Sequence, residues 1–159
     1  MFSANKYFGV LYTDAGSTAQ SLVNNTSEYL AWASQYPSVM APRGTVRDPT
    51  TDESITVQWA GVYRISLFLK FTLSVATNIR ISFATYDGTS DTTIAYGCSE
   101  EIKCAEAAPV PYVVNMSCIA PLLKDAEVRV IITAIGANTA ITVAYGNFTI
   151  QGVGPTPAD

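Results

Sequence analysis

The sequence contains no histidine, and this absence excludes several kinds of site. Histidine is the commonest general base, the commonest zinc ligand and a member of the usual catalytic triad. The sequence also lacks a nucleophile elbow, a phosphate-binding glycine-rich loop, an EF-hand loop and a Cys-x-x-Cys pair. We therefore expect no catalytic residues, no cofactor and no metal ion, and hence no enzyme.

Charged residues are scarce as well, at 14% of 159 residues, whereas 48% of the residues are hydrophobic. An average domain has about a quarter of its residues charged. A chain with so little charge often covers part of its surface in an oligomer or on a larger body. The formal net charge is -4 and no cluster of Lys and Arg occurs, which excludes nucleic acid as a partner. No apolar run reaches the ~18 residues that span a bilayer, so we expect no membrane contact.

The N-terminal residues MFSANKYFGV lack the apolar core of a secretory signal. If Met1 is the natural start, this predicts synthesis and folding in the cytoplasm. Reduced thiols are then expected for Cys98, Cys104 and Cys118, although a Cys98–Cys104 bond would close a small loop. Their spacing matches no zinc pattern, so we interpret the three cysteines as small hydrophobic residues.

Residues 61–71, GVYRISLFLKF, alternate with a period of two, which predicts a half-buried strand of an antiparallel sheet. Tyr63 and every second residue after it are apolar and point one way. Arg64, Ser66 and Lys70 point the other way. Phe68 lies on the side of the charged residues, and a large aromatic residue there is either covered by a neighbour or exposed to a partner.

Turn signals recur every 8–12 residues along the rest of the chain, among them a hairpin signal at Asp87-Gly88 and a turn signal at Gly146-Asn147, and no segment has a convincing helical pattern. About ten short strands are therefore expected over residues 6–153, in an all-β antiparallel sandwich, a jelly roll or a barrel. Residues 1–5 would form an arm and residues 154–159 a flexible tail. Residues 99–109 are expected to be a long loop or a short helix. The expected strands are 6–13, 17–23, 27–36, a short one within 37–49, 54–58, 61–71, 78–86, 92–96, 109–118, 127–134, 140–144 and 147–153.

Three groups of carboxylates fall in predicted loops, where acidic residues normally form solvated turns. They are Glu100 with Glu101, Asp48 with Asp52 and Glu53, and Asp87 with Asp91. A glycoside hydrolase needs only two carboxylates, so all three groups are candidates for an enzyme, and replacing Glu100 or Glu101 by Gln would test it. A loop cluster would also suit a calcium ion. Trp32, Trp59 and nine tyrosines are interpreted as core or subunit interface in preference to a sugar-binding face.

Four segments in this order carry a resemblance to a known superfamily: STAQSL (17–22), ITVQWAGVYRISLFLKF (55–71), IAPLLKDAEVRV (119–130) and AYGNFTIQGV (144–153). They resemble the jelly-roll superfamily of tumour necrosis factor (TNF) and the complement heads, and look closest to bacteriophage virion proteins such as capsid decoration or head-fibre proteins. Ala60, Gly61 and Tyr63 match its "G-x-Y" strand opening. Leu122, Leu123, Lys124, Asp125 and Val128 match its "pL-x-x-G-D-x-V-x-V" element, except that Lys124 replaces the usual Gly.

The resemblance implies an all-β, TNF-like antiparallel jelly-roll sandwich of about ten strands that forms a homotrimer, and a structural role in a virion. We expect a non-enzymatic capsid decoration (cement) protein on the capsid surface, which binds the major capsid protein and stabilises the phage head. The alternatives are a receptor-binding or fibre-head protein that recognises host surface glycans, and a carboxylate-dependent glycan-degrading enzyme. Phe68 and Tyr112 are the expected trimer-interface residues, and Phe2, Lys6 and Tyr7 the expected capsid-contact arm.

Overall fold

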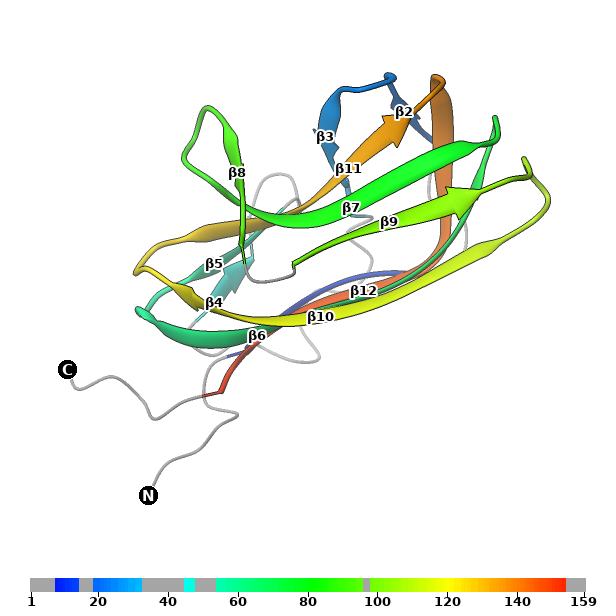
Figure 1. Cartoon of the computed structure of the whole chain (residues 1–159). Helices are drawn as coiled ribbons and strands as arrows, with labels where there is room; N and C mark the ends of the chain where they lie inside the picture. Colours follow the sequence, from blue (N-terminus) through cyan, green and yellow to red (C-terminus); the bar gives the residue numbers. More distant parts are fainter. Residues whose placement is uncertain (1–7, 15–18, 33–44, 48–53, 96–97, 154–159) are drawn as a thin grey trace.

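The computed structural model describes residues 8–14, 19–32, 45–47, 54–95 and 98–153. These residues form two antiparallel sheets stacked as a sandwich (Figure 1). The expected all-β jelly-roll class is confirmed. The strands are β1 Phe8–Asp14, β2 Gln20–Leu22, β3 Ser27–Tyr29, β4 Thr45–Arg47, β5 Ser54–Val57, β6 Gly61–Leu73, β7 Thr77–Tyr86, β8 Asp91–Thr93, β9 Ser99–Cys104, β10 Tyr112–Leu122, β11 Glu127–Ile135 and β12 Thr139–Gly152.

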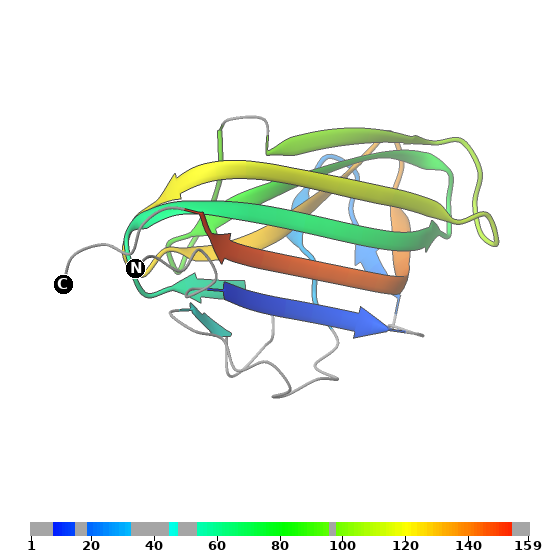
Figure 2. The same cartoon turned by 90° about the horizontal axis from the view of Figure 1, so that it is seen from below.

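One sheet has five strands, in the order β1-β12-β6-β10, with β2 also paired to β12. Figure 2 shows its four long strands side by side. β6 is the strand expected from residues 61–71, and it extends two residues further. Its inward residues from Tyr63 to Leu73 are buried, whereas Arg64 and Lys70 are exposed. The alternation therefore predicts correctly which face of this sheet meets the core.

The other sheet has seven strands, in the order β4-β5-β11-β7-β8. β3 pairs with β11 and β9 pairs with β7 outside that path. β11 is central, because it pairs with β7 along its whole length and with β3 and β5 on its other side. The predicted turn at Asp87-Gly88 joins β7 to β8: Asp87 Oδ1 accepts hydrogen bonds from Thr89 N and Ser90 N, and Gly88 has φ +95°.

The core between the sheets contains a stack of three aromatic rings. Phe148 of the five-stranded sheet lies between Phe83 of the seven-stranded sheet and Trp32, with ring centroids 5.9 and 6.0 Å apart and nearly parallel planes. All three side chains are buried. Offset stacking of this kind adds to the burial of large apolar surfaces, so the stack holds the two sheets together.

Two expectations about the strands are wrong. Residues 99–109 begin with strand β9, because the edge of β7 offers a partner and Ile102 and Cys104 turn toward the core. The polar composition of this segment does not outweigh that pairing. The expected turn at Gly146-Asn147 is absent, since β12 is continuous and only a bulge between Val143 and Tyr145 shifts its register against β6.

Several expected elements fall partly or wholly outside the described residues. The arm at 1–5, the tail at 154–159 and the second half of the strand expected at 27–36 lie there. Within the described part of that last segment, only Ser27–Tyr29 forms a strand. The short strand expected within residues 37–49 is β4.

Candidate functional site

Phe68 lies on the outer face of the five-stranded sheet, as its place on β6 predicts. The register puts it between Asn115 of β10 and Asn147 of β12. It is half-buried, because the ring of Tyr145 packs edge-on against it with centroids 5.6 Å apart. Phe68 is therefore partly covered within its own chain and still presents part of its ring to the outside.

Four exposed apolar side chains share this face with Phe68. The exposed fractions are 44% for Val62, 56% for Val113, 50% for Ile119 and 40% for Tyr145. Val113 and Tyr145 flank Lys70 in one cross-strand row, and Ile119 lies opposite Arg64 in another. We call Val62, Phe68, Val113, Ile119 and Tyr145 the apolar face. The outward positions of β6, β10 and β12 carry two cations and no carboxylate.

Tyr112 shares this sheet with Phe68 but points the other way. Its ring packs against Phe71 in the core, with centroids 6.1 Å apart. Its hydroxyl accepts a hydrogen bond from Glu106 N (2.8 Å) and donates one to Glu106 O (3.2 Å). The two residues expected at one interface thus lie on opposite faces. Phe2, Lys6 and Tyr7 lie outside the described residues.

Of the three carboxylate groups expected in loops, one lies on a strand, one includes a turn residue, and one lies outside the described residues. Glu100 and Glu101 are adjacent on β9, so they point to opposite sides of the strand, and Glu101 pairs with Arg80 at 3.6 Å. Hydrogen bonds from Ser90 and Thr89 amides hold the pKa of Asp87 below its usual value. Asp48, Asp52 and Glu53 lie outside the described residues.

The cysteines differ from the expectation of three reduced thiols. Cys98 and Cys118 form a disulfide, with Cα atoms 5.4 Å apart. Cys98 directly precedes β9 of one sheet and Cys118 lies on β10 of the other, so the bond links two strands whose proximity the sequence does not reveal. Cys104 is a buried thiol, and desolvation raises its pKa to about 11.

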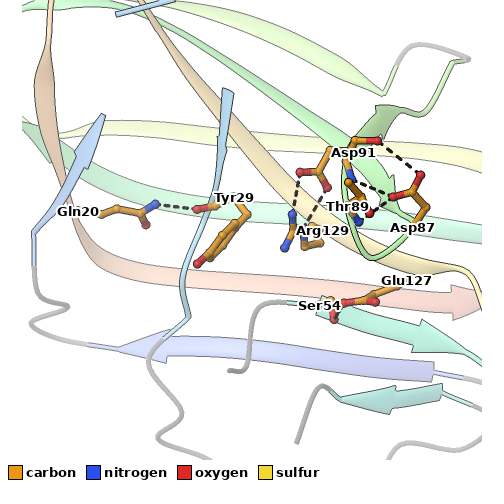
Figure 3. Close-up of polar contacts among 9 residues, drawn as sticks. Gln20, Tyr29, Ser54, Asp87, Thr89, Asp91, Glu127 and Arg129 are labelled. Carbon is orange, nitrogen blue, oxygen red and sulfur yellow. Dashed lines mark hydrogen bonds and ion pairs between the residues drawn. The ribbon is translucent and has the colours of Figure 1, made fainter. Parts of the chain in front are cut away.

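The outer face of the seven-stranded sheet holds a buried arginine that the sequence analysis missed (Figure 3). Arg129 is only 6% exposed. Its guanidinium lies between the rings of Tyr29 and Tyr86, at 4.5 and 3.7 Å from the ring centroids. We call Tyr29, Tyr86 and Arg129 the arginine cage.

Asp91 closes the cage with a two-point contact. Arg129 Nε donates to Asp91 Oδ1 at 3.0 Å, and Nη2 donates to Oδ2 at 2.8 Å. Such fork-to-fork pairs are stronger and more directional than single ion pairs. The only sequence signal for them was the Asp87-Gly88 hairpin, which brings Tyr86 opposite Asp91. Nothing in the sequence brings Arg129 beside that hairpin.

Within the described ranges, no group of three or more Cys, Asp or Glu side chains is placed to hold a metal ion. No helix in that part of the chain is long and apolar enough to cross a membrane. The outer face of the five-stranded sheet carries exposed apolar side chains, and that of the seven-stranded sheet carries the arginine cage.

Comparisons of sequence find no relative, since neither a protein-family model nor a curated protein matches the chain. Comparisons of structure do. An Eiger TNF from S. frugiperda covers 96% of each chain with a TM-score of 0.54 and 14% identity. Murine APRIL at pH 5.0 covers 91% of this chain and 98% of its own, with a TM-score of 0.59 and 12% identity, and the same protein at pH 8.0 gives 0.58.

The fold is TNF-like. The part of the resemblance that concerned the jelly-roll of tumour necrosis factor is therefore confirmed for the fold. At 12–14% identity this likeness shows the architecture and carries no function. The expected closeness to bacteriophage virion proteins stays a prediction.

Proposed function

We propose that this chain forms a homotrimer that acts by binding and serves as a decoration protein on a phage-like capsid. The apolar face is the single observation that supports self-association best. Four exposed apolar side chains and Phe68 lie there on three neighbouring strands. Several exposed apolar side chains on one sheet face of a chain with few charges are typical of protein interfaces.

The composition of the apolar face favours a second copy of the chain as its occupant. Asn115 and Asn147 flank Phe68 in register, so the centre of the face is neutral. Lys70 lies one outward position after Phe68 on β6, in a row with Val113 and Tyr145, and Arg64 lies two outward positions before it, opposite Ile119. The aliphatic stems of both cations can pack beside these apolar side chains while their charged ends stay hydrated, which is compatible with a subunit contact.

Binding, and not catalysis, is the mode of action that the remaining observations support. The sequence has no histidine. Glu100 and Glu101, which a glycan-degrading enzyme would use, point to opposite sides of β9, whereas a glycosidase needs two carboxylates facing one bond. We therefore favour the two binding functions, capsid decoration and receptor binding, over the glycan-degrading enzyme.

The capsid as partner rests on the resemblance to phage virion proteins. A trimer contacts its partner three times, so weak individual contacts by Phe2, Lys6 and Tyr7 and by exposed loops would add up through avidity. In this proposal the chain binds the major capsid protein on the capsid surface, and this binding makes the phage head more resistant to heat.

Electron microscopy of purified particles tests this function. Stoichiometric copies on the capsid surface, together with heads that lose heat resistance when the protein is absent, are the expected result. A few copies per particle, at a tail or fibre tip, would contradict decoration.

A receptor-binding head is the second candidate, and the tip of the sandwich favours it. Leu123 is 80% exposed in the β10–β11 turn, and Trp59 is exposed in the β5–β6 turn. The two turns are joined by hydrogen bonds from Asp125 N to Val57 O (2.8 Å) and from Val57 N to Ala126 O (2.9 Å). A rigid apolar tip suits a contact with a host surface. Inhibition of particle adsorption by the purified protein is the expected result of this alternative.

A further inference from the structure

We infer that the chain docks on its partner through one end of the sandwich, with Leu123 as the side chain that enters an apolar pocket of the partner protein. This end, which we call the tip, consists of the β5–β6 turn, residues 58–60, and the β10–β11 turn, residues 123–126. The docking surface rests on the proposed function, because its partner is the major capsid protein. It adds the residues that make the contact.

Leu123 is far more exposed than the other apolar side chains of the molecule. Its exposed fraction is 80%, whereas the other exposed large apolar side chains of the described residues lie between 36% and 56%. Leu122, directly before it, is only 5% exposed and belongs to the core, so the chain turns one leucine inward and the next outward. Burial of Leu123 in a partner would recover the free energy that its exposure forgoes.

Isolated exposed leucines also occur on surfaces without a partner, so the backbone that carries Leu123 matters as well. Ala126 N donates to Leu123 O at 3.1 Å, and Asp125 takes the left-handed conformation with φ +63°. Asp125 N donates to Val57 O at 2.8 Å, and Val57 N donates to Ala126 O at 2.9 Å. Leu123 is therefore presented on a rigid backbone, so binding has little chain entropy left to remove.

The neighbouring β5–β6 turn is tied to the core. Tyr63, which is 2% exposed, donates a hydrogen bond from its hydroxyl to Trp59 O at 2.7 Å. Trp59 is itself 36% exposed, so this turn adds part of an aromatic ring to the tip. Aromatic residues are enriched at contacts between proteins. The tip thus offers an aliphatic and an aromatic side chain on two turns that are hydrogen-bonded to each other.

The charges beside Leu123 favour a protein as the occupant. Lys124 and Asp125 follow it, both exposed and of opposite sign. An anionic lipid surface attracts clusters of Lys and Arg, and a lysine next to an aspartate is no such cluster. A glycan presents mainly hydroxyl groups, which find no partner in an aliphatic side chain. A protein pocket can take up the leucine and leave both charged side chains hydrated at its rim.

The first strand begins and the last strand ends on the side of the molecule that carries the tip. Phe8, the first residue of β1, pairs with Gln151 near the end of β12, and Val153 N donates to Val62 O at 3.0 Å beside the β5–β6 turn. Figure 1 shows β6 beginning and β10 ending at this same end. The arm predicted to contact the capsid is joined to Phe8. The arm and Leu123 therefore start from one end of the sandwich, which favours the capsid as their common partner.

Co-sedimentation with virion heads that lack the protein tests this docking surface. The wild type and three variants are titrated onto heads purified from a mutant that does not make the protein. We expect the dissociation constant to rise about 10-fold or more for Leu123→Ser, because burial of one leucine side chain is worth at least that factor. Leu123→Met keeps an apolar side chain of similar size and should bind within about three-fold of the wild type. Val75→Ser, which changes a valine that is 45% exposed at the opposite end of the sandwich, should bind like the wild type.

Three further measurements identify the occupant of the tip. All four proteins should have the same mass by light scattering, and dissociation of Leu123→Ser alone would assign Leu123 to the subunit contact and overturn the docking surface. Vesicles of phosphatidylcholine and phosphatidylserine should not bind the wild type, and binding that Leu123→Ser loses would make the occupant a lipid surface instead. Adsorption of particles to host cells that is inhibited by the wild type but not by Leu123→Ser would assign the tip to the receptor of the second candidate function.

Failure of the docking surface and failure of the proposed function give different results. Heads that bind Leu123→Ser as tightly as the wild type would refute the role of Leu123 and leave capsid decoration intact. Heads that do not bind the wild type would contradict decoration itself, and the docking surface with it.

Discussion

At the scale of single residues, Cys104 gives a prediction about pH. Its thiol is buried, and desolvation raises its pKa from 9.0 to about 11. The folded state therefore keeps a proton that the unfolded state releases above pH 9. The stabilising contribution of the thiol is fully present below pH 9 and is lost as the pH rises toward 11. We expect the difference in unfolding free energy between wild type and Cys104→Ala to shrink over that range in denaturant titrations. A difference that stays constant from pH 8 to pH 11 would contradict the burial of this thiol.

Tyr112 and Phe68 show what the sequence says about the direction of a side chain. Phe68 could be placed on the outer face because the alternation of β6 is strict and its charged residues mark that face. The same rule applied to β10 would have placed Tyr112 correctly, because Tyr112 is separated by an even number of residues from the buried Met116 and Cys118 and so points to the same side of the strand. Tyr112 was paired with Phe68 because both lie in one sheet, without regard to the face on which each side chain lies.

The buried state of Arg129 could not be read in this way. Its neighbours Val128 and Val130 face the core, which places the arginine outward and suggests exposure. The tyrosines and Asp91 that bury it come from three other strands. Such a site depends on strand order and register, and a single sequence specifies neither.

At the scale of elements, the disulfide between Cys98 and Cys118 links β10 to the segment that leads into β9. The two cysteines are 20 residues apart in the chain. Closing a loop of that length restricts the unfolded chain and is worth about 3 kcal/mol. We expect the double variant Cys98→Ala with Cys118→Ala to lose about that much unfolding free energy in urea titrations.

Cys104→Ala is the matched control for the disulfide variant, because it removes a buried thiol from the neighbouring strand without opening a loop. Reduction of the wild-type protein should reproduce the loss seen in the double variant. Identical urea midpoints with and without reductant would show that the bond does not form in solution.

The strands that the sequence misassigned have a common physical cause. In β9, Glu100, Glu101 and Lys103 favour a loop or a helix locally, but pairing with β7 decides the conformation. In β12, Gly146 and Asn147 give a turn signal, but β12 pairs with β1 on one side and β6 on the other, so the strand continues through these two residues. Partners on the sheet override local propensity at both places. Where local signals and pairing agree, as in β6 and at Asp87-Gly88, the sequence predicted the structure well.

At the scale of the whole molecule, turn spacing and alternation were enough to predict an all-β sandwich, jelly roll or barrel, and the resemblance selected the jelly-roll sandwich, which the TNF-like architecture confirms. The two outer faces differ in a way that composition does not show. One carries exposed valine, isoleucine and tyrosine around Phe68, and the other a caged arginine with its carboxylate. The first face is the one proposed above as the subunit contact.

The solution mass of the wild type and of Phe68→Ser, measured by size-exclusion chromatography with light scattering, tests the trimer most directly. Val75→Ser, which changes an exposed valine in the β6–β7 turn away from the apolar face, is the matched control. We expect three times the 17.0 kDa chain mass for the wild type and the control. Phe68→Ser should give the mass of one chain with an unchanged β-sheet circular dichroism spectrum. A monomeric wild type, or a Phe68→Ser variant that remains trimeric at micromolar concentration, would contradict this assignment.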